Sequence, residues 1–496
     1  MTRPAHSITS SGLSLLGSQY GLAVVNVAIS MVMLRLLSKP QFAVVATLEI
    51  LSALVAFSDP GLNSVVVQRA PAGFKAGGDE RSSLGLIKLA LACRLVVLAV
   101  LGLVFVLLGS RISLLFLKTT AYTAEMRLLV VGALLSATWE SLQVVAQAVQ
   151  DFKMIARWNL LGGITKQVLA LLLFFPFGFW GYLTGLVASI ALVNVAMAWS
   201  LRRYLWASVP AAPIGPTLRY AFPYFLRRFF RFGFLQFDLA AVGAMLQPEA
   251  LAMYGVARRL AGYIMQVTES FQTPILMRVA SLRQETAEER GVFARKAMRY
   301  ITLLIVPICA LVAAASPWIM GVFGGAKYAA GWPILAVLAI GQSLYALYSN
   351  QAIYVFVVRA PWATLFLDGL SGLLSFGSVP LIILSLGVYG VGLGQILGLI
   401  AGTVLARVLL RAHREIRFDW ESLRLLIVPL GVAVAVIVAG QRLWFRIWSV
   451  PVFCALAGTI FVLLLRPRLS EEDRRQLGRI LPSWVAGVGR TGRGPD

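Results

Sequence analysis

About fourteen long apolar runs divide this 496-residue sequence. Each run is close to the roughly 20 apolar residues that a helix needs to cross a bilayer. Because only helices and closed barrels satisfy their backbone polar groups inside a membrane, the runs predict an all-α integral membrane protein. The charged fraction of 13% agrees, since soluble domains carry about 25%. The predicted spans lie near 11–34, 41–58, 84–108, 127–149, 159–178, 180–200, 218–245, 250–276, 300–320, 332–356, 363–385, 388–410, 422–440 and 447–465.

The Lys and Arg residues outside these runs predict how the helices are oriented. Cytoplasmic segments of membrane proteins are enriched in Lys and Arg. If the N-terminus is cytoplasmic, most of the 44 Lys and Arg residues fall in cytoplasmic segments, above all at 278–299, 407–424 and from 466 onward. We therefore expect both termini in the cytoplasm. The formal net charge of +23 then reflects topology and contact with anionic lipid headgroups, and nucleic acid is not an expected partner.

Two similar segments indicate an internal repeat. LLSKPQFAVVATLEIL (36–51) and MLQPEALAMYGVARRL (245–260) each place a leucine before a proline, then a polar residue and a small residue. Transporters are often built from two related halves. We therefore predict four parts: an N-terminal lobe of helices 1–6 at 11–201, a C-terminal lobe of helices 7–12 at 218–410, two further helices at 422–465, and a cytoplasmic tail at 466–496.

Several charged residues lie inside the apolar runs. In FPYFLRRFFRFGFLQFD, helical geometry places Arg227 and Arg231 on one face, and the next run places Arg258 and Glu269 on one face. An Arg at mid-membrane costs about 2.5–3.5 kcal/mol, so these side chains should face water, charged partners or an anionic ligand. An arginine near a helix end could instead reach the headgroups, which is an alternative for Arg227 and Arg228.

Polar residues recur on many of the other runs. A polar stripe on one helix usually serves interhelical hydrogen bonding, whereas its recurrence predicts a shared water-filled cavity. Basic residues outnumber acidic ones within the runs, so the ligand of this cavity should be an anion. The neutral members of the stripes include Gln19, Asn26, Gln143, Gln147 and Gln266, and the acidic residues are Glu49, Glu140, Asp238, Glu269 and Asp368.

The cysteines and histidines do not predict a metal site or a cofactor. The three cysteines, Cys93, Cys309 and Cys454, all lie inside apolar runs, which is typical of thiols in a helical core. The two histidines, His6 and His413, lie near predicted membrane edges and far apart in the sequence. We therefore expect neither a metal centre nor a cofactor.

Four further patterns resemble a known family. LRLLSKPQFAVVATLEI followed by FSDPGLNSVVVQR is similar to the opening signature of the Wzx-like polysaccharide flippases, in the multidrug/oligosaccharidyl-lipid/polysaccharide exporter superfamily. LQPEALAMYGVARRL resembles the start of their second lobe, PWIMGVFGGAKYAAGWPILAVLA the segment after helix nine, and SLGVYGVGLGQILG the opening of helix twelve. The sequence departs from the family at Pro60, where leucine is usual, and at Ala43 and Ala252, where glycine is common.

The resemblance implies a transporter of the bacterial inner membrane and not an enzyme. Its lobes would alternate between inward- and outward-open states and move undecaprenyl-diphosphate-linked oligosaccharides to the periplasmic leaflet. H+ or Na+ would drive transport through one of the five acidic residues, and a polysaccharide polymerase or export machinery would be a partner. Sugar would meet Trp139 and the neutral stripe residues, and the diphosphate would bind among Lys88, Arg94, Lys166, Arg227, Arg231, Arg258 and Arg259.

Three alternatives remain at this point. A flippase of peptidoglycan precursors (lipid II) would also have fourteen helices and a basic cavity, and only the motifs argue against it. A cation or drug antiporter of the same superfamily should have a cavity dominated by carboxylates. A membrane polymerase or glycosyltransferase usually carries its catalytic residues on a long outward loop. Here the longest outward loop, near 109–126, has Glu125 as its one acidic residue.

Overall fold

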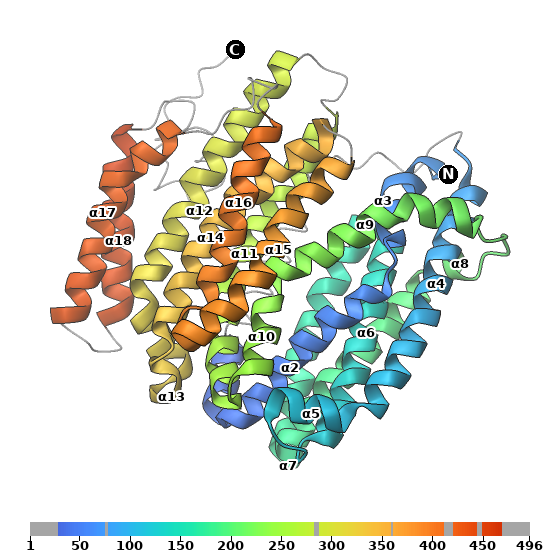
Figure 1. The fold of residues 1–496 in the computed structure, drawn as a ribbon, viewed down its shortest axis with the longest axis horizontal. Coiled ribbons are helices and arrows are strands. Elements are labelled where there is room, and N and C mark those ends of the chain that lie inside the picture. Colours follow the sequence, from blue (N-terminus) through green and yellow to red (C-terminus); the bar gives the residue numbers. More distant parts are fainter. Residues whose placement is uncertain are drawn as a thin grey trace, which may run out of the picture. The chain divides into compact units, whose positions relative to one another are not determined.

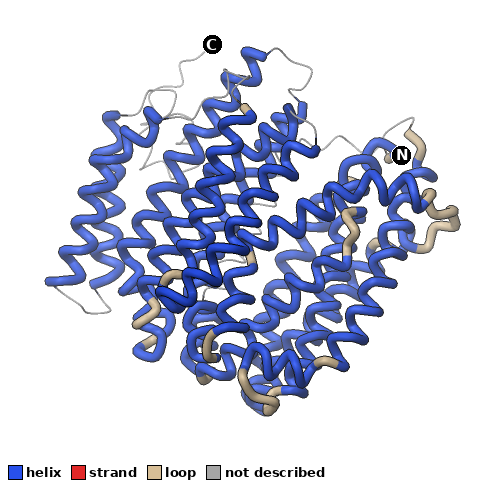
Figure 2. Tube along the Cα trace, in the orientation of Figure 1, coloured by secondary structure: helices blue, strands red, loops and turns tan. Residues whose placement is uncertain are grey.

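The computed structural model describes residues 28–74, 78–281, 287–358, 361–410, 420–443 and 449–468. Throughout this part the chain forms helices joined by short loops, and no strand occurs in it (Figures 1 and 2). The all-α prediction is therefore confirmed. The helices are α2 (Lys39–Val55), α3 (Leu62–Gly73), α4 (Glu80–Leu107), α5 (Gly109–Leu117), α6 (Thr123–Ala148), α7 (Phe152–Ser200), α8 (Arg202–Leu205), α9 (Ile214–Leu235), α10 (Phe237–Met245), α11 (Pro248–Ser281), α12 (Ala287–Gly324), α13 (Ala326–Ala329), α14 (Trp332–Val358), α15 (Pro361–Leu386), α16 (Val391–Leu409), α17 (Trp420–Leu443) and α18 (Ser449–Leu465).

Nine helices in the described part are long and apolar enough to cross a membrane. Each predicted run from residue 41 onward coincides with one or two helices, and the run at 11–34 lies mostly outside the described residues. The chain is a multi-pass membrane protein. The count of fourteen spans and the cytoplasmic termini stay predictions.

Helix α7 contains the break that the sequence places between the runs at 159–178 and 180–200. Gly178 has φ 59° and ψ −140° inside this 49-residue segment, and Pro176 lies two residues before it. Glycine adopts positive φ without steric cost, and proline removes a backbone hydrogen bond from the preceding turn. Two helices therefore meet end to end at Gly178.

The predicted run at 218–245 is broken by a feature that sequence analysis missed. The backbone leaves the helical region at Gln236, with φ −142°, and this residue separates α9 from α10. Helices α3 and α5 were also not expected. Both are shorter than the roughly 20 residues that cross a bilayer, which explains why a search for long apolar runs does not find them.

The chain divides into two compact units. The first comprises Met1–Val256 and Pro361–Gly402, and the second comprises Ala257–Ala360 and Thr403–Asp496. In the first unit, α2 packs on α6, α3 packs on α4 and α6, and α15 packs on α9 although it lies far along the sequence. In the second, α12 packs on α14 and α17, and α17 packs on α18. The two six-helix lobes stay a prediction.

Close packing fixes α9 against α15 within the first unit. A side chain at Gly372 would overlap the carbonyl oxygen of Phe230, and one at Gly233 would lie 2.8 Å from the carbonyl oxygen of Gly372. The ring of Phe376 also meets the ring of Phe237 at the start of α10 edge to face, with 4.8 Å between centroids. Because both backbones approach at glycines, α15 holds α9 and its charged residues in a defined position.

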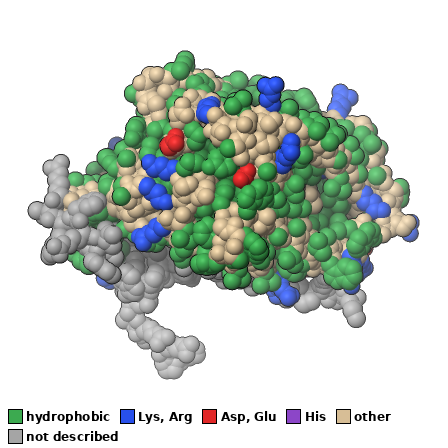
Figure 3. Space-filling view, turned by 90° about the horizontal axis from the view of Figure 1, so that it is seen from below, with side chains coloured by type: hydrophobic (Ala, Val, Ile, Leu, Met, Phe, Trp, Pro, Cys, Tyr) green, Lys and Arg blue, Asp and Glu red, His purple; other side chains and the backbone are tan. Residues whose placement is uncertain are grey.

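The surface of the protein agrees with a membrane setting. Figure 3 shows Lys and Arg side chains scattered over a face made mostly of apolar and neutral side chains, with few acidic side chains among them. Large apolar residues such as Phe175 on α7 and Leu384 on α15 are about three-quarters exposed. Such exposure is costly in water but favourable against lipid.

Candidate functional site

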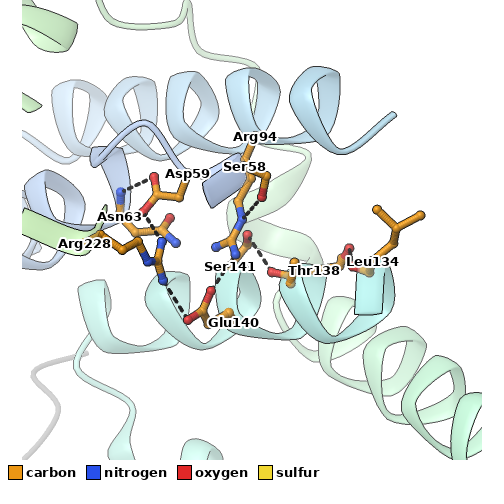
Figure 4. A network of polar contacts seen from close by, with 10 residues as sticks. Ser58, Asp59, Asn63, Arg94, Leu134, Thr138, Glu140, Ser141 and Arg228 are labelled. Carbon is orange, nitrogen blue, oxygen red and sulfur yellow. Dashed lines mark hydrogen bonds and ion pairs between the residues drawn. The ribbon is translucent and has the colours of Figure 1, made fainter. Parts of the chain in front are cut away.

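Two arginines and two carboxylates form a connected network in the first unit (Figure 4). The carboxylate of Glu140, on α6, accepts hydrogen bonds from Arg94 Nη2 on α4 at 2.5 Å and from Arg228 Nη2 on α9 at 2.8 Å. Arg228 Nη1 also donates to Asp59 Oδ2 at 3.0 Å. Arg94 Nε donates to the hydroxyl of Ser58 at 3.3 Å. The network thus joins α4, α6, α9 and the turn before α3.

The motif FSDPGLN explains how Asp59 reaches this network. Asp59 lies between a short 3-10 helix (Ala56–Ser58) and α3, and its Oδ1 accepts the backbone N–H of Asn63 at 3.2 Å. Gly61 follows with φ 89°, and any Cβ there would overlap the carbonyl oxygen of Ala221 on α9. Glycine tolerates both the positive φ and the close approach. The loop from Asp59 to Gly61 can therefore lie directly against α9, at a point about two helical turns before Arg228.

The network is buried at one end and partly exposed at the other. The side chains of Arg94 and Asp59 are 1% and 4% exposed, whereas those of Arg228 and Glu140 are 29% and 43% exposed. Within the described part of the chain, Arg94 Nη1 is buried without a hydrogen-bond partner. Two positive and two negative groups balance, so burying the network is tolerable only while its ion pairs stay intact.

A second ion pair lies on the adjacent face of α9. Arg227 Nε donates to Asp368 Oδ2 of α15 at 2.6 Å, and the side chain of Asp368 is 2% exposed. Closer to the start of α9, the hydroxyl of Tyr224 donates to Gln68 Oε1 of α3 at 3.0 Å. Helix α9 therefore presents Arg228 to α6 and to the turn before α3, and presents Arg227 to α15.

Three further predicted site residues make contacts inside the first unit. Lys88 Nζ donates to the carbonyl oxygen of Val209 at 3.0 Å. Gln143 donates to Asn159 Oδ1 of α7 at 2.5 Å. The buried carboxylate of Asp238 accepts a hydrogen bond from Tyr254 at 2.5 Å. These contacts hold helices and loops together, and the role of these three residues in binding stays a prediction.

The structure places the other predicted site residues as follows. Glu49 is exposed on α2, and Trp139, Gln147, Lys166 and Arg231 are half-buried on α6, α7 and α9. Four more belong to the second unit on α11: Arg258, Arg259, Gln266 and Glu269. Of these, Glu269 accepts a hydrogen bond from Tyr345 of α14 at 3.4 Å. Gln19 and Asn26 lie outside the described residues.

Sequence reasoning left two members of the network, Asp59 and Arg228, out of the predicted site. Asp59 belongs to the motif FSDPGLN, but it follows the end of the predicted run at 41–58 and was not counted among the acidic residues in the runs. Arg228 lies at the edge of the predicted charged face of its helix. The acidic residue inside a family-like motif is the signal that could have identified Asp59.

Comparisons with known proteins agree with this architecture. The lipid II flippase MurJ in an inward closed conformation has a TM-score of 0.67 at 14% identity, covering 91% of this chain and 99% of its own. A multidrug resistance MATE family transporter of the MOP superfamily, inward-facing, gives 0.60 at 16% identity, covering 82% and 99%. A MOP superfamily transporter from Pyrococcus furiosus gives 0.58 at 15% identity, covering 81% and 95%. At identities this low, the structural similarity shows a shared fold alone.

Sequence comparison defines the family. No curated protein matches the chain. Residues 32–333, more than half of the chain, match the family described as "Polysaccharide biosynthesis protein", and a bacterial inner membrane is consistent with that family. The chain therefore belongs to the polysaccharide biosynthesis protein family and has the fold of the MOP superfamily transporters.

Proposed function

We propose that this protein is a flippase for lipid-linked oligosaccharides. It would move undecaprenyl-diphosphate-linked repeat units from the cytoplasmic to the periplasmic leaflet, for the synthesis of O-antigen, exopolysaccharide or capsule. Family membership supports a role in polysaccharide synthesis. The shared fold supports transport by alternating access, because a lipid II flippase and a multidrug transporter both have it.

The observation that carries this proposal is the arginine network with a half-exposed end. A diphosphate is an anion, and the planar guanidinium of arginine suits phosphate oxygens. Glu140 already bridges Arg94 and Arg228 with its two carboxylate oxygens. The Glu140 carboxylate therefore keeps the two guanidinium groups close enough together for a single anionic group to contact both.

We propose that a phosphate of the substrate displaces Glu140 from these two arginines. Glu140 is the more exposed partner in both of its ion pairs, so it can turn toward water at low cost. Arg228 would keep its hydrogen bond to Asp59, which holds the guanidinium in place during the exchange. The buried Arg94 would gain acceptors for Nη1, which lacks a partner within the described residues.

The remaining roles follow from the same proposal. Lys166, Arg231, Arg258 and Arg259 are further candidates for the diphosphate, and the neutral polar residues and Trp139 are candidates for the sugar. H+ or Na+ would drive the cycle through Glu49, Glu140, Asp238, Glu269 or Asp368. A polysaccharide polymerase or export machinery would receive the product.

A peptidoglycan-precursor flippase is the second candidate function. The lipid II flippase MurJ shares the fold over 91% of this chain, and its substrate by name is also a lipid-linked molecule. An antiporter of cationic drugs is less well supported, because the two carboxylates of the network are already neutralised by arginines.

Mass spectrometry of polyprenyl-diphosphate lipids tests the proposal in cells. Cells that lack the protein should accumulate lipid-linked repeat units, and the native chain should clear them. Arg228→Gln should fail to clear them, whereas Arg111→Gln, the same change at an exposed arginine of α5, should succeed. If lipid II accumulates instead of repeat units, the second candidate is correct. If neither lipid accumulates, the flippase proposal is wrong.

A further inference from the structure

A groove of about 670 Å³ lies beside the first half of α9, apart from the arginine network. Six α9 residues between 218 and 224 line it, together with Trp362 in the first turn of α15. Its volume lies within the roughly 300–1,000 Å³ of typical small-molecule sites. Among the described residues, none of the proposed substrate contacts lines this groove.

One part of the groove is apolar and exposed. The side chains of Phe222 and Trp362 are each 51% exposed although both are large and apolar. Tyr220 and Trp362 have rings with one polar atom, which is typical of residues at the boundary between acyl chains and headgroups. The groove therefore offers an apolar wall of the kind that a hydrocarbon chain contacts, beside rings that suit the boundary with lipid headgroups.

The other part of the groove is basic. Arg219 lines it and is exposed, and the guanidinium of Arg69 lies 3.8 Å from the centroid of the Tyr220 ring, which also lines it. Hydrogen bonds from Tyr220 and Tyr224 to Gln68, at 3.5 and 3.0 Å, fix the two tyrosines against α3. No acidic side chain is among the described residues that line the groove.

We propose that this groove binds one anionic phospholipid. Arg219 and Arg69 would hold the phosphate of its headgroup, because basic residues at the membrane surface attract anionic lipids. Phe222 and Trp362 would contact the start of an acyl chain. Apolar walls and two cations match an amphiphile with a negative headgroup. A free sugar lacks the apolar chain, and a zwitterionic lipid lacks the net negative charge, so both match the groove less well.

The position of the groove gives such a lipid a way to influence the arginine network. Tyr220 and Arg228 lie on the same helix, about 12 Å apart along its axis at 1.5 Å per residue. A phospholipid seated between α9 and Trp362 of α15 would stabilise the start of α9. Binding of this phospholipid would be independent of which substrate the protein transports.

Native mass spectrometry of the full chain in detergent tests this proposal. The protein would be mixed with phosphatidylglycerol or phosphatidylcholine at equal concentration, and retained lipids counted. Arg219→Gln and Trp362→Ala are the test variants. Arg111→Gln and Trp332→Ala are matched controls, because both residues are exposed and lie on other helices.

The native chain should retain one phosphatidylglycerol in preference to phosphatidylcholine. Arg219→Gln should weaken phosphatidylglycerol retention about fivefold, since one basic residue near the membrane surface contributes about 1 kcal/mol. Trp362→Ala should weaken retention of both lipids, and both controls should behave like the native chain.

Three results would overturn the proposal. The first is equal retention by Arg219→Gln and Arg111→Gln. The second is release of the lipid by millimolar inorganic phosphate, which would show a phosphate site without an acyl-chain contact. The third is competition by polyprenyl diphosphate at equal concentration, which would assign the groove to the transported substrate.

Discussion

Replacing Glu140 by glutamine should destabilise the first unit through Arg94. The side chain of Arg94 is 1% exposed, and its Nη2 donates to Glu140. In Glu140→Gln the guanidinium keeps a neutral acceptor but loses the negative charge that compensates it. Arg228 is less affected, because Asp59 still accepts from its Nη1. The predicted loss therefore arises from one buried, uncompensated charge.

The size of the loss in unfolding free energy follows from how deeply the Arg94–Glu140 ion pair is buried. Removing one partner of a buried ion pair costs about 3–5 kcal/mol. Glu140 is 43% exposed and glutamine retains a hydrogen-bond acceptor, so we expect a loss of about 2–3 kcal/mol. The entropy of unfolding is about 2.1 cal/mol/K per residue. For 496 residues the midpoint should therefore fall by about 2–3 °C if the whole chain unfolds together.

Thermal unfolding of the purified protein in detergent measures this loss, with Arg94→Met in the Glu140→Gln background as the second variant. Because the double variant removes the buried charge as well as its partner, it should be more stable than Glu140→Gln alone. The reasoning is refuted if Glu140→Gln unfolds at the native temperature, or if the added Arg94→Met lowers the midpoint further.

The remaining predictions concern α15 and the ligand. Gly372→Ala should lower the unfolding midpoint because the new methyl group overlaps the backbone of α9, whereas Gly377→Ala, with no atom within 4 Å of its Cβ, should not; equal midpoints would contradict the close packing. Arg227→Gln should destabilise more than Arg227→Gln combined with Asp368→Asn, because the single variant removes the cation 2.6 Å from a carboxylate that is 2% exposed; the reverse order in thermal unfolding would contradict this. If substrate displaces Glu140, then Glu140→Gln should bind farnesyl diphosphate more tightly in calorimetry, and weaker binding would show that the carboxylate is not a competitor.

The fold follows from the sequence to a large extent, because apolar length determines which segments can cross a bilayer. Even the break inside α7 is signalled, by Pro176 and Gly178. The separation of α9 from α10 at Gln236 has no such signal, since neither glycine nor proline marks it. Likewise, no local pattern shows that α15 packs on α9, because that contact depends on residues more than a hundred positions apart.

The site was predicted less well, and the reason is electrostatic. Counting charges within the apolar runs indicated a cavity with excess positive charge. The structure pairs Arg228 with Asp59, which follows the end of an apolar run, and pairs Arg227 with Asp368. Pairing depends on which helices are neighbours, and sequence spacing does not contain that information. The network is therefore balanced in charge, with one half-exposed carboxylate between two arginines.

Leaflet exchange in reconstituted liposomes tests the central claim most directly. Liposomes would contain the purified protein and an undecaprenyl-diphosphate oligosaccharide, with an ion gradient imposed across the membrane. Periodate would oxidise sugars in the outer leaflet alone. The account predicts that the native chain and Arg111→Gln make nearly all of the oligosaccharide accessible, and that Arg228→Gln leaves the inner-leaflet share protected. If liposomes with the native chain protect as much oligosaccharide from periodate as protein-free liposomes do, the account is contradicted.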